Sequence, residues 1–275
     1  ATGFLANATK QYAVAIGSGP NNKEDSTRAD GVGAIALGGN GVKGAQAAGD
    51  NAVSIAGQST ASGANAIAIG RKSTASQTSA IALGDSGTAS GAQAIAIGEN
   101  SLASGTNSTA IGFGAKAQNS YDYAAGTQAH ALSGKSIALG YQAYADSKRD
   151  VNNPNDLSSA IAIGANASAI AEAGGNEAIA IGQNTIAKKS GIAIGYKANA
   201  PQNGAIAMGW SANATAAKSG IAIGDRANAT GDYRFSGVDV ATSTSSVAGI
   251  VGQDLSDFKR NIRAFGGENA RGVIS

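Results

Sequence analysis

A short phrase of alternating small and branched residues recurs along the chain at a spacing of 14 residues. It reads Ala-Ile-Ala-Ile-Gly at Ala66–Gly70, and related phrases end at Gly84, Gly98 and Gly112. Fourteen copies can be counted by their closing residues, at positions 17, 38, 56, 70, 84, 98, 112, 126, 140, 164, 182, 195, 209 and 224. Self-similarity at a fixed period is the signature of a solenoid, so this repeat constrains the fold more than any other feature.

Each copy contains two segments with the pattern of a short strand. The first is the phrase itself, and the second has small residues three and five positions after the closing glycine, as at Ser73 and Ala75. This alternation has the period of a β-strand, and glycine supplies turn angles that other residues resist. The sequence therefore predicts an all-β chain whose coils stack into two parallel sheets.

The two predicted strands differ in what their faces carry. The Ile-Ala-Ile strand is apolar on both faces and is expected to be buried on both sides, whereas the second strand has one polar face. The repeat contains no amphipathic helix that could cover the apolar sheet. We therefore expect a second copy of the chain to cover it, because one coil buries too little apolar surface to offset the entropy of ordering it.

Composition and charge exclude several classes of function. Glycine makes up 40 of the 275 residues and aromatic residues 5%, which favours a thin, repetitive core. The net charge is +2 without a block of Lys or Arg, so nucleic acid is not an expected partner. The chain has no Cys and no apolar run near the roughly 20 residues of a membrane helix. If the protein is exported, we expect its signal and membrane anchor to lie outside this sequence, which itself makes no direct membrane contact.

No catalytic, cofactor-binding or metal-binding constellation emerges from the sequence. His130 is the only histidine and falls in the polar series, where a solvated side chain is expected. Carboxylates such as Asp85 and Glu99 are scattered singly, and Gly38–Gly41 lacks the Lys-Ser or Lys-Thr and helix of a phosphate loop. A left-handed β-helix transferase would need a six-residue repeat. The chain is therefore predicted not to be an enzyme and to need no cofactor.

The repeated phrase and its spaced small residues resemble the head of the Yersinia adhesin (YadA) type of trimeric autotransporter adhesin, from about Tyr12 to Thr230. The resemblance implies a left-handed parallel β-roll, a homotrimer, and display on a Gram-negative cell surface through an outer-membrane anchor. It also implies binding to extracellular matrix proteins such as collagen or fibronectin, or to abiotic surfaces, and cell-cell autoaggregation. The handedness and the number three come from this resemblance alone.

Two regions depart from the repeat. Within a head spanning residues 1–231, the segments 18–33 and 141–159 are longer than the period needs and are predicted to protrude as loops. Residues 232–275 are interpreted as a connecting segment. A short helix is predicted there, because apolar residues recur at helical spacing before Gly266 and Gly267, namely Leu255, Phe258, Ile262 and Phe265.

Aromatic and basic residues near these features are the candidates for adhesion. Four aromatic residues directly follow a repeat glycine, and they either form exposed contact points or shield the coil edge. With residues of the second long segment, the candidates are Phe113, Tyr141, Tyr144, Lys148, Arg149, Tyr196 and Trp210. A passive spacer that displays another binding module is the alternative function. An ice-binding solenoid is disfavoured because Thr occupies only two of eleven outward positions on the polar strand.

Overall fold

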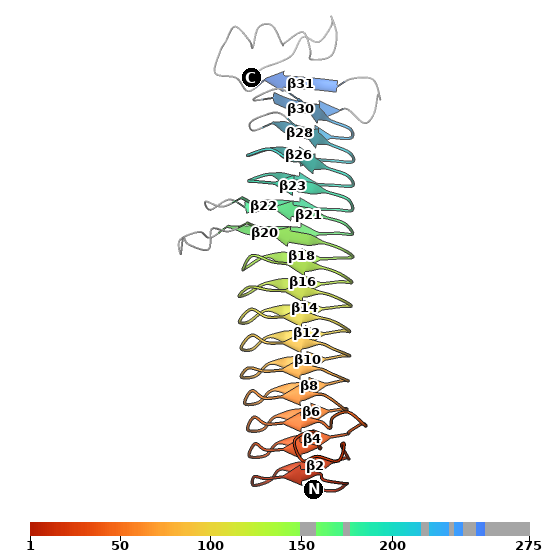
Figure 1. The fold of residues 1–275 in the computed structure, drawn as a ribbon. Helices are drawn as coiled ribbons and strands as arrows, with labels where there is room; N and C mark the ends of the chain where they lie inside the picture. The colour runs from red at the N-terminus through yellow and green to blue at the C-terminus, as the bar shows by residue number, and fades with distance from the viewer. Residues whose placement is uncertain (149–157, 173–176, 216–219, 231–233, 239–245, 251–275) are drawn as a thin grey trace, which may run out of the picture. The chain divides into compact units, whose positions relative to one another are not determined.

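The computed structural model describes residues 1–148, 158–172, 177–215, 220–230, 234–238 and 246–250. The chain divides into two compact units, Ala1–Lys135 and Ser136–Ser275, each of which is described by itself. Every regular element in these residues is a β-strand, and Figure 1 shows the strands of each unit stacked above one another. The prediction of an all-β parallel solenoid with coils of about 14 residues is confirmed.

In unit 1 the Ile-Ala-Ile phrases form one parallel sheet, here called the apolar sheet, and the second segments form the polar sheet. The apolar sheet contains β2 (Val14–Ile16), β4 (Ile35–Leu37), β6 (Val53–Ile55), β8 (Ile67–Ile69), β10 (Ile81–Leu83), β12 (Ile95–Ile97), β14 (Thr109–Ile111) and β16 (Tyr123–Ala125). The polar sheet contains β1 (Asn7–Ala8), β3 (Arg28–Ala29), β5 (Gln46–Ala47), β7 (Thr60–Ala61), β9 (Thr74–Ala75), β11 (Thr88–Ala89), β13 (Leu102–Ala103), β15 (Lys116–Ala117) and β17 (His130–Ala131).

Unit 2 repeats the same arrangement. Its apolar sheet contains β18 (Ile137–Leu139), β20 (Ser159–Ile163), β22 (Glu177–Ile181), β24 (Ile192–Ile194), β26 (Ile206–Met208), β28 (Ile221–Gly224) and β30 (Arg234–Val238), with β31 (Ser246–Ile250) antiparallel to β30. Its polar sheet contains β19 (Tyr144–Asp146), β21 (Ser168–Ile170), β23 (Ile186–Lys188), β25 (Asn199–Ala200), β27 (Asn213–Ala214) and β29 (Asn228–Ala229).

The repeat extends further at both ends than the sequence analysis counted. Thr2 bridges Ile16 in parallel, and Gly3 has the positive φ of a closing glycine, 124°. An additional copy therefore closes at Gly3. At the other end, β30 pairs in parallel with β28, although the tail after Gly231 was expected to leave the repeat. The predicted helix around Leu255 to Phe265 lies outside the described residues.

The core of the roll consists mainly of alanine, with serine, threonine and one aspartate at some positions. Each coil points alanines inward from both sheets, such as Ala68 and Ala75, and every fully buried apolar residue among those described is Ala. A gap filled by methyl groups has no room for isoleucine, so the Ile side chains on either side of the central Ala point away from it. Within one chain, the apolar strand is therefore buried on its Ala face only.

The closing glycines are required by both conformation and space. Gly84 has φ of 127°, and a Cβ there would lie 2.7 Å from the backbone of Gly98 in the next coil. The prediction that glycine supplies these angles holds at this corner. The tight turns also contain left-handed residues that are mostly not glycine, such as Asn65, Ser79 and Lys72.

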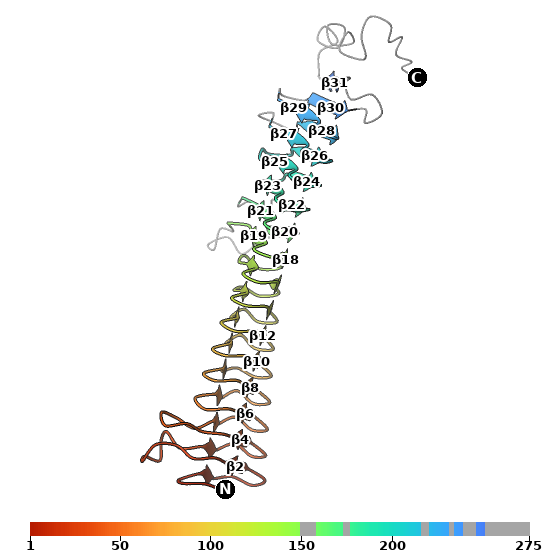
Figure 2. The ribbon, with the colours of Figure 1, turned by 90° about the vertical axis from the view of Figure 1, so that its right-hand side faces the viewer.

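The first long segment protrudes less than expected, because only part of it leaves the roll. Residues 18–33 include β3, and Ser26 and Thr27 are fully buried. A second insertion that the sequence analysis did not single out, Gly39–Gly44, lies beside it, with the Gly44 N–H donating to the Asp25 carbonyl at 2.7 Å. Figure 2 shows these segments projecting from the stacked coils of unit 1.

The second long segment, 141–159, likewise contains regular structure. It includes β19 and the first residue of β20, so both strands belong to the roll rather than to a loop. Residues 149–157 lie outside the described residues.

Candidate functional site: the outer faces of the roll

The outer face of the apolar sheet carries two columns of side chains, here called the first and second ladders. They are the first and third residues of each Ile-Ala-Ile strand, and equivalent residues pair in register, as Ile67, Ile81 and Ile95 do. In unit 1 the first ladder is Val14, Ile35, Val53, Ile67, Ile81, Ile95, Thr109 and Tyr123. The second is Ile16, Leu37, Ile55, Ile69, Leu83, Ile97, Ile111 and Ala125.

Both ladders are partly exposed in the single chain. Ile16 is 48% exposed, Ile69 37% and Ile223 40%. The expected in-register ladders are confirmed, but none of the residues that the structure describes covers them. A contiguous apolar surface of this kind marks a surface for association.

The outer face of the polar sheet is mixed in character, as the sequence predicts. His130 lies on it beside Lys116 of the neighbouring strand, and the pKa of its imidazole is lowered by burial and by the Lys116 charge. In unit 2, Asn199, Asn213 and Asn228 form a ladder in which each amide donates to the next, at 2.8 and 3.1 Å. These amide bonds tie neighbouring coils together on the side away from the aliphatic ladders.

Three of the four aromatic residues that follow a repeat glycine are exposed. Phe113 is 46% exposed, Tyr141 52% and Trp210 44%, while Tyr196 is half-buried. Their exposure favours a role for Phe113, Tyr141 and Trp210 as contact points rather than as side chains that shield the coil edge. Phe113 lies in unit 1 and the other three in unit 2.

The structure brings two of these aromatics together with two cations. The rings of Tyr196 and Trp210 stack with centroids 6.1 Å apart and planes 15° from parallel. Lys197 Nζ lies 5.1 Å from the Tyr196 ring centre, and the Arg226 guanidinium lies 4.6 Å from that of Trp210. Neither cation was predicted from the repeat pattern, although both stand two positions after a closing glycine.

Tyr144 and Lys148 are linked through Asp146, which the sequence analysis did not single out. The Tyr144 hydroxyl donates to Asp146 Oδ2 at 3.1 Å, and the Lys148 N–H donates to Asp146 Oδ1 at 3.1 Å. Burial raises the pKa of Tyr144, and the Asp146 carboxylate raises it further. Arg149, the remaining candidate, lies outside the described residues.

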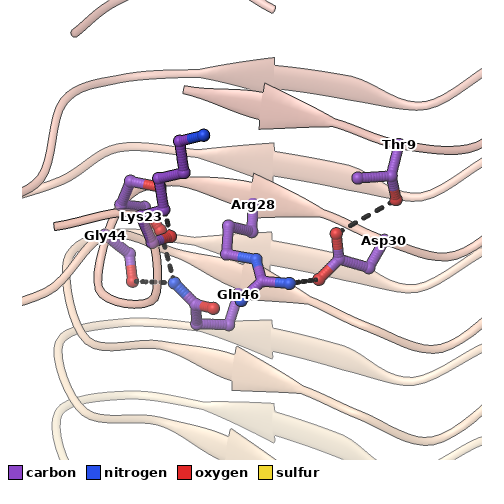
Figure 3. A network of polar contacts seen from close by, with 7 residues as sticks. Thr9, Lys23, Arg28, Asp30, Gly44 and Gln46 are labelled. Carbon is purple, nitrogen blue, oxygen red and sulfur yellow. Dashed lines mark hydrogen bonds and ion pairs between the residues drawn. The ribbon is translucent and has the colours of Figure 1, made fainter. Parts of the chain in front are cut away.

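A polar network ties the two insertions of unit 1 to the polar sheet (Figure 3). Arg28 pairs with Asp30 at 2.8 Å, and Thr9 Oγ1 donates to the same carboxylate at 3.1 Å. Gln46 Nε2 donates to the Ser26 carbonyl at 2.5 Å and, more weakly, to that of Gly44 at 3.4 Å. Gln46 thus links both segments to the roll, whereas the contacts of Asp30 with Arg28 and Thr9 join neighbouring coils.

Nearly all buried polar groups of the described residues have partners within the chain, and Arg28 Nε is an exception. Asp122 is fully buried where the preceding coil has Ser108, and its Oδ2 accepts from the Asn119 N–H at 2.8 Å. No group of three or more metal-ligating side chains occurs among the described residues. A search of the same residues finds no helix with the length and apolarity needed to cross a membrane.

Comparison with known families decides what this roll is. The sequence model of the YadA head domain repeat matches residues 1–19, 61–86, 89–115, 117–146, 187–212 and 216–233, just over half of the chain. The chain belongs to the YadA head family. YadA head repeats are typical of trimeric autotransporter adhesins, which are surface-exposed and non-catalytic. No curated protein matches the chain.

The stretches that the YadA head repeat does not match coincide with the irregular coils. Residues 20–60 contain both insertions of unit 1, and residues 147–186 contain most of the second long segment. The family pattern is thus carried by most of the regular coils, and the insertions fall outside the matched residues.

Proposed function

We propose that the protein is the head of a trimeric adhesin in which three copies pack their apolar sheets around a common axis. The observation that carries this proposal is the pair of aliphatic ladders exposed along the apolar sheet. A closed ring of copies covers these faces without leaving an unpaired one, and membership of the YadA head family supports the number three.

The assembled head attaches the cell to extracellular matrix proteins such as collagen or fibronectin, or to abiotic surfaces, and promotes autoaggregation. It is displayed at the bacterial surface and anchored in the outer membrane through regions outside this sequence. The exposed aromatic residues and the long segments are the proposed contact points, because loops on a rigid scaffold commonly carry function. Three copies of each weak contact raise avidity.

A passive spacer is the second candidate function. The unbroken stacking of the middle coils of unit 1, where β8 to β16 follow one another without insertion, favours it for that stretch. The two insertions, which Gln46 links to the roll, favour a binding head instead, since a spacer has no need of interruptions.

Two measurements test the proposal. Light scattering on the purified protein should report three times the chain mass, and a stable monomer would contradict the assembly. Coating of collagen, fibronectin and polystyrene by the parent is then compared with that of a variant lacking Lys148 to Asp156. We expect this variant to stay trimeric and to bind less. A parent that binds none of the three surfaces would favour the spacer.

A further inference from the structure

One coil of unit 1 breaks the aliphatic ladders. At β16 the first ladder carries Tyr123 and the second carries Ala125, where neighbouring coils carry two side chains of similar, intermediate size. Tyr123 is 40% exposed and brings the only aromatic ring to the ladders of this unit. Compared with the neighbouring coils, β16 therefore has a larger side chain at one edge of the sheet, Tyr123, and a smaller one at the other edge, Ala125.

This break matters because the rest of the face is periodic. Coils repeat about every 4.8 Å along the stack, so two copies with uniform ladders would also fit when displaced by one coil. Repetitive surfaces specify their register weakly unless a distinctive residue marks one position. The Tyr123 and Ala125 coil is such a mark.

The geometry of a ring places these two residues against each other. In a closed ring the contacts are heterologous, so one edge of each apolar sheet meets the opposite edge of the next copy. The strands run across the stack, and Tyr123 and Ala125 therefore lie at one level. In register, the ring of Tyr123 fills the space that Ala125 of the next copy leaves.

In a closed ring, a copy that slips by one coil shifts its two contacts in opposite directions, and both contacts lose this match. One direction sets Tyr123 against Ile111 of the neighbouring copy, which overfills the contact, and the other sets Thr109 against Ala125, which leaves a void. Both overfilling and voids destabilise a packed interface.

We infer that the β16 coil, through Tyr123 and Ala125, fixes the axial register between copies of this chain. The inference rests on the proposed trimer and adds to it which coil aligns the three chains. Aligned chains bring the insertions and exposed aromatics of the three copies to the same level, where they act together on one ligand surface.

Disulfide trapping tests this inference, because the chain has no cysteine of its own. The reporter Ile81→Cys with Leu83→Cys links neighbouring copies only in register, and Ile81→Cys with Ile69→Cys links them only after a shift of one coil. Covalent dimers and trimers on a denaturing gel report links between chains, because every chain carries both cysteines. Each reporter is placed in the parent, in a levelled variant (Tyr123→Ile with Ala125→Ile) and in a swapped variant (Tyr123→Ala with Ala125→Tyr).

We expect the parent and the swapped variant to link in register, and the levelled variant to gain shifted links by about tenfold. A levelled variant that is trimeric without shifted links would overturn the inference. So would a swapped variant that links like the levelled one, or a trimeric parent whose in-register reporter does not link. A parent that light scattering shows to be monomeric overturns the proposed assembly itself.

Discussion

Single residues decide whether one coil can close against the next. Gly84 has φ of 127°, and a Cβ there would lie 2.7 Å from the backbone of the next coil. Both the backbone angle and the lack of space therefore require glycine at this position. Two positions on, Ser86 has φ of 56° and tolerates the left-handed region through its short side chain. The two positions look alike as turn residues in the sequence but differ in the space around them.

We therefore predict that Gly84→Ala lowers the free energy of unfolding by roughly 1–3 kcal/mol per chain, because the added methyl displaces the next coil. Ser86→Gly in the same turn is the control and should change it by less than about 1 kcal/mol, since glycine adopts the same angles. Thermal melting followed by circular dichroism measures both. Equal melting temperatures for Gly84→Ala and the parent would contradict the close approach.

A second prediction at this scale concerns pH. Burial and the Lys116 charge lower the pKa of His130, so the unfolded chain binds the proton more tightly than the folded one. Stability should be full above the ordinary histidine pKa of about 6.5 and fall as the pH drops through it. Melting temperatures between about pH 7.5 and 5.5 should decline less for His130→Gln than for the parent. Identical slopes would mean that His130 is indifferent to folding.

At the scale of the strand, the spacing between the two sheets determines which side chains face inward. The central residue of the apolar strands, Ala in most coils and Ser54 in β6, is fully buried opposite Ala of the polar strands, and the gap accepts only small side chains. We predict that Ala82→Leu lowers the melting temperature strongly, because the larger side chain forces the sheets apart. Thr88→Leu, on the outer face of the polar sheet, should be tolerated because Leu102 occupies the equivalent position one coil later. Similar melting of the two variants would contradict an alanine core.

The 14-residue period could predict the sheets, their parallel pairing and their register, because every coil repeats the same local pattern. It could not predict which side of Ile-Ala-Ile faces inward, since both sides are apolar and the answer depends on the distance to the other sheet. It also placed β3 within a loop, because the insertion before Arg28 hides the resumed alternation. The period also gives no distances between side chains, so it did not reveal that Lys197 lies over the adjacent Tyr196 ring or that Arg226 lies over Trp210 of the preceding coil.

For the whole molecule, an alanine-rich core and exposed aliphatic ladders indicate that the stable folded unit is an assembly of several chains. The side chains that could bury most apolar area, such as Ile95, lie on the outer face, while the core gains only methyl groups. Small inward and large outward residues are the reverse of an ordinary domain. Assembly should therefore contribute much of the stability.

We predict that Ile95→Asp abolishes assembly, because it buries an unpaired carboxylate from each copy at the shared axis. Light scattering should then report the mass of one chain, and the melting temperature should fall. Leu102→Asp is the matched control: it introduces the same charge in the next polar strand, on the face turned away from the ladders, and should stay trimeric. An Ile95→Asp variant that assembles and melts like the parent would show that the ladders are not the interface, and the copies would then have to meet through the polar sheet or the turns.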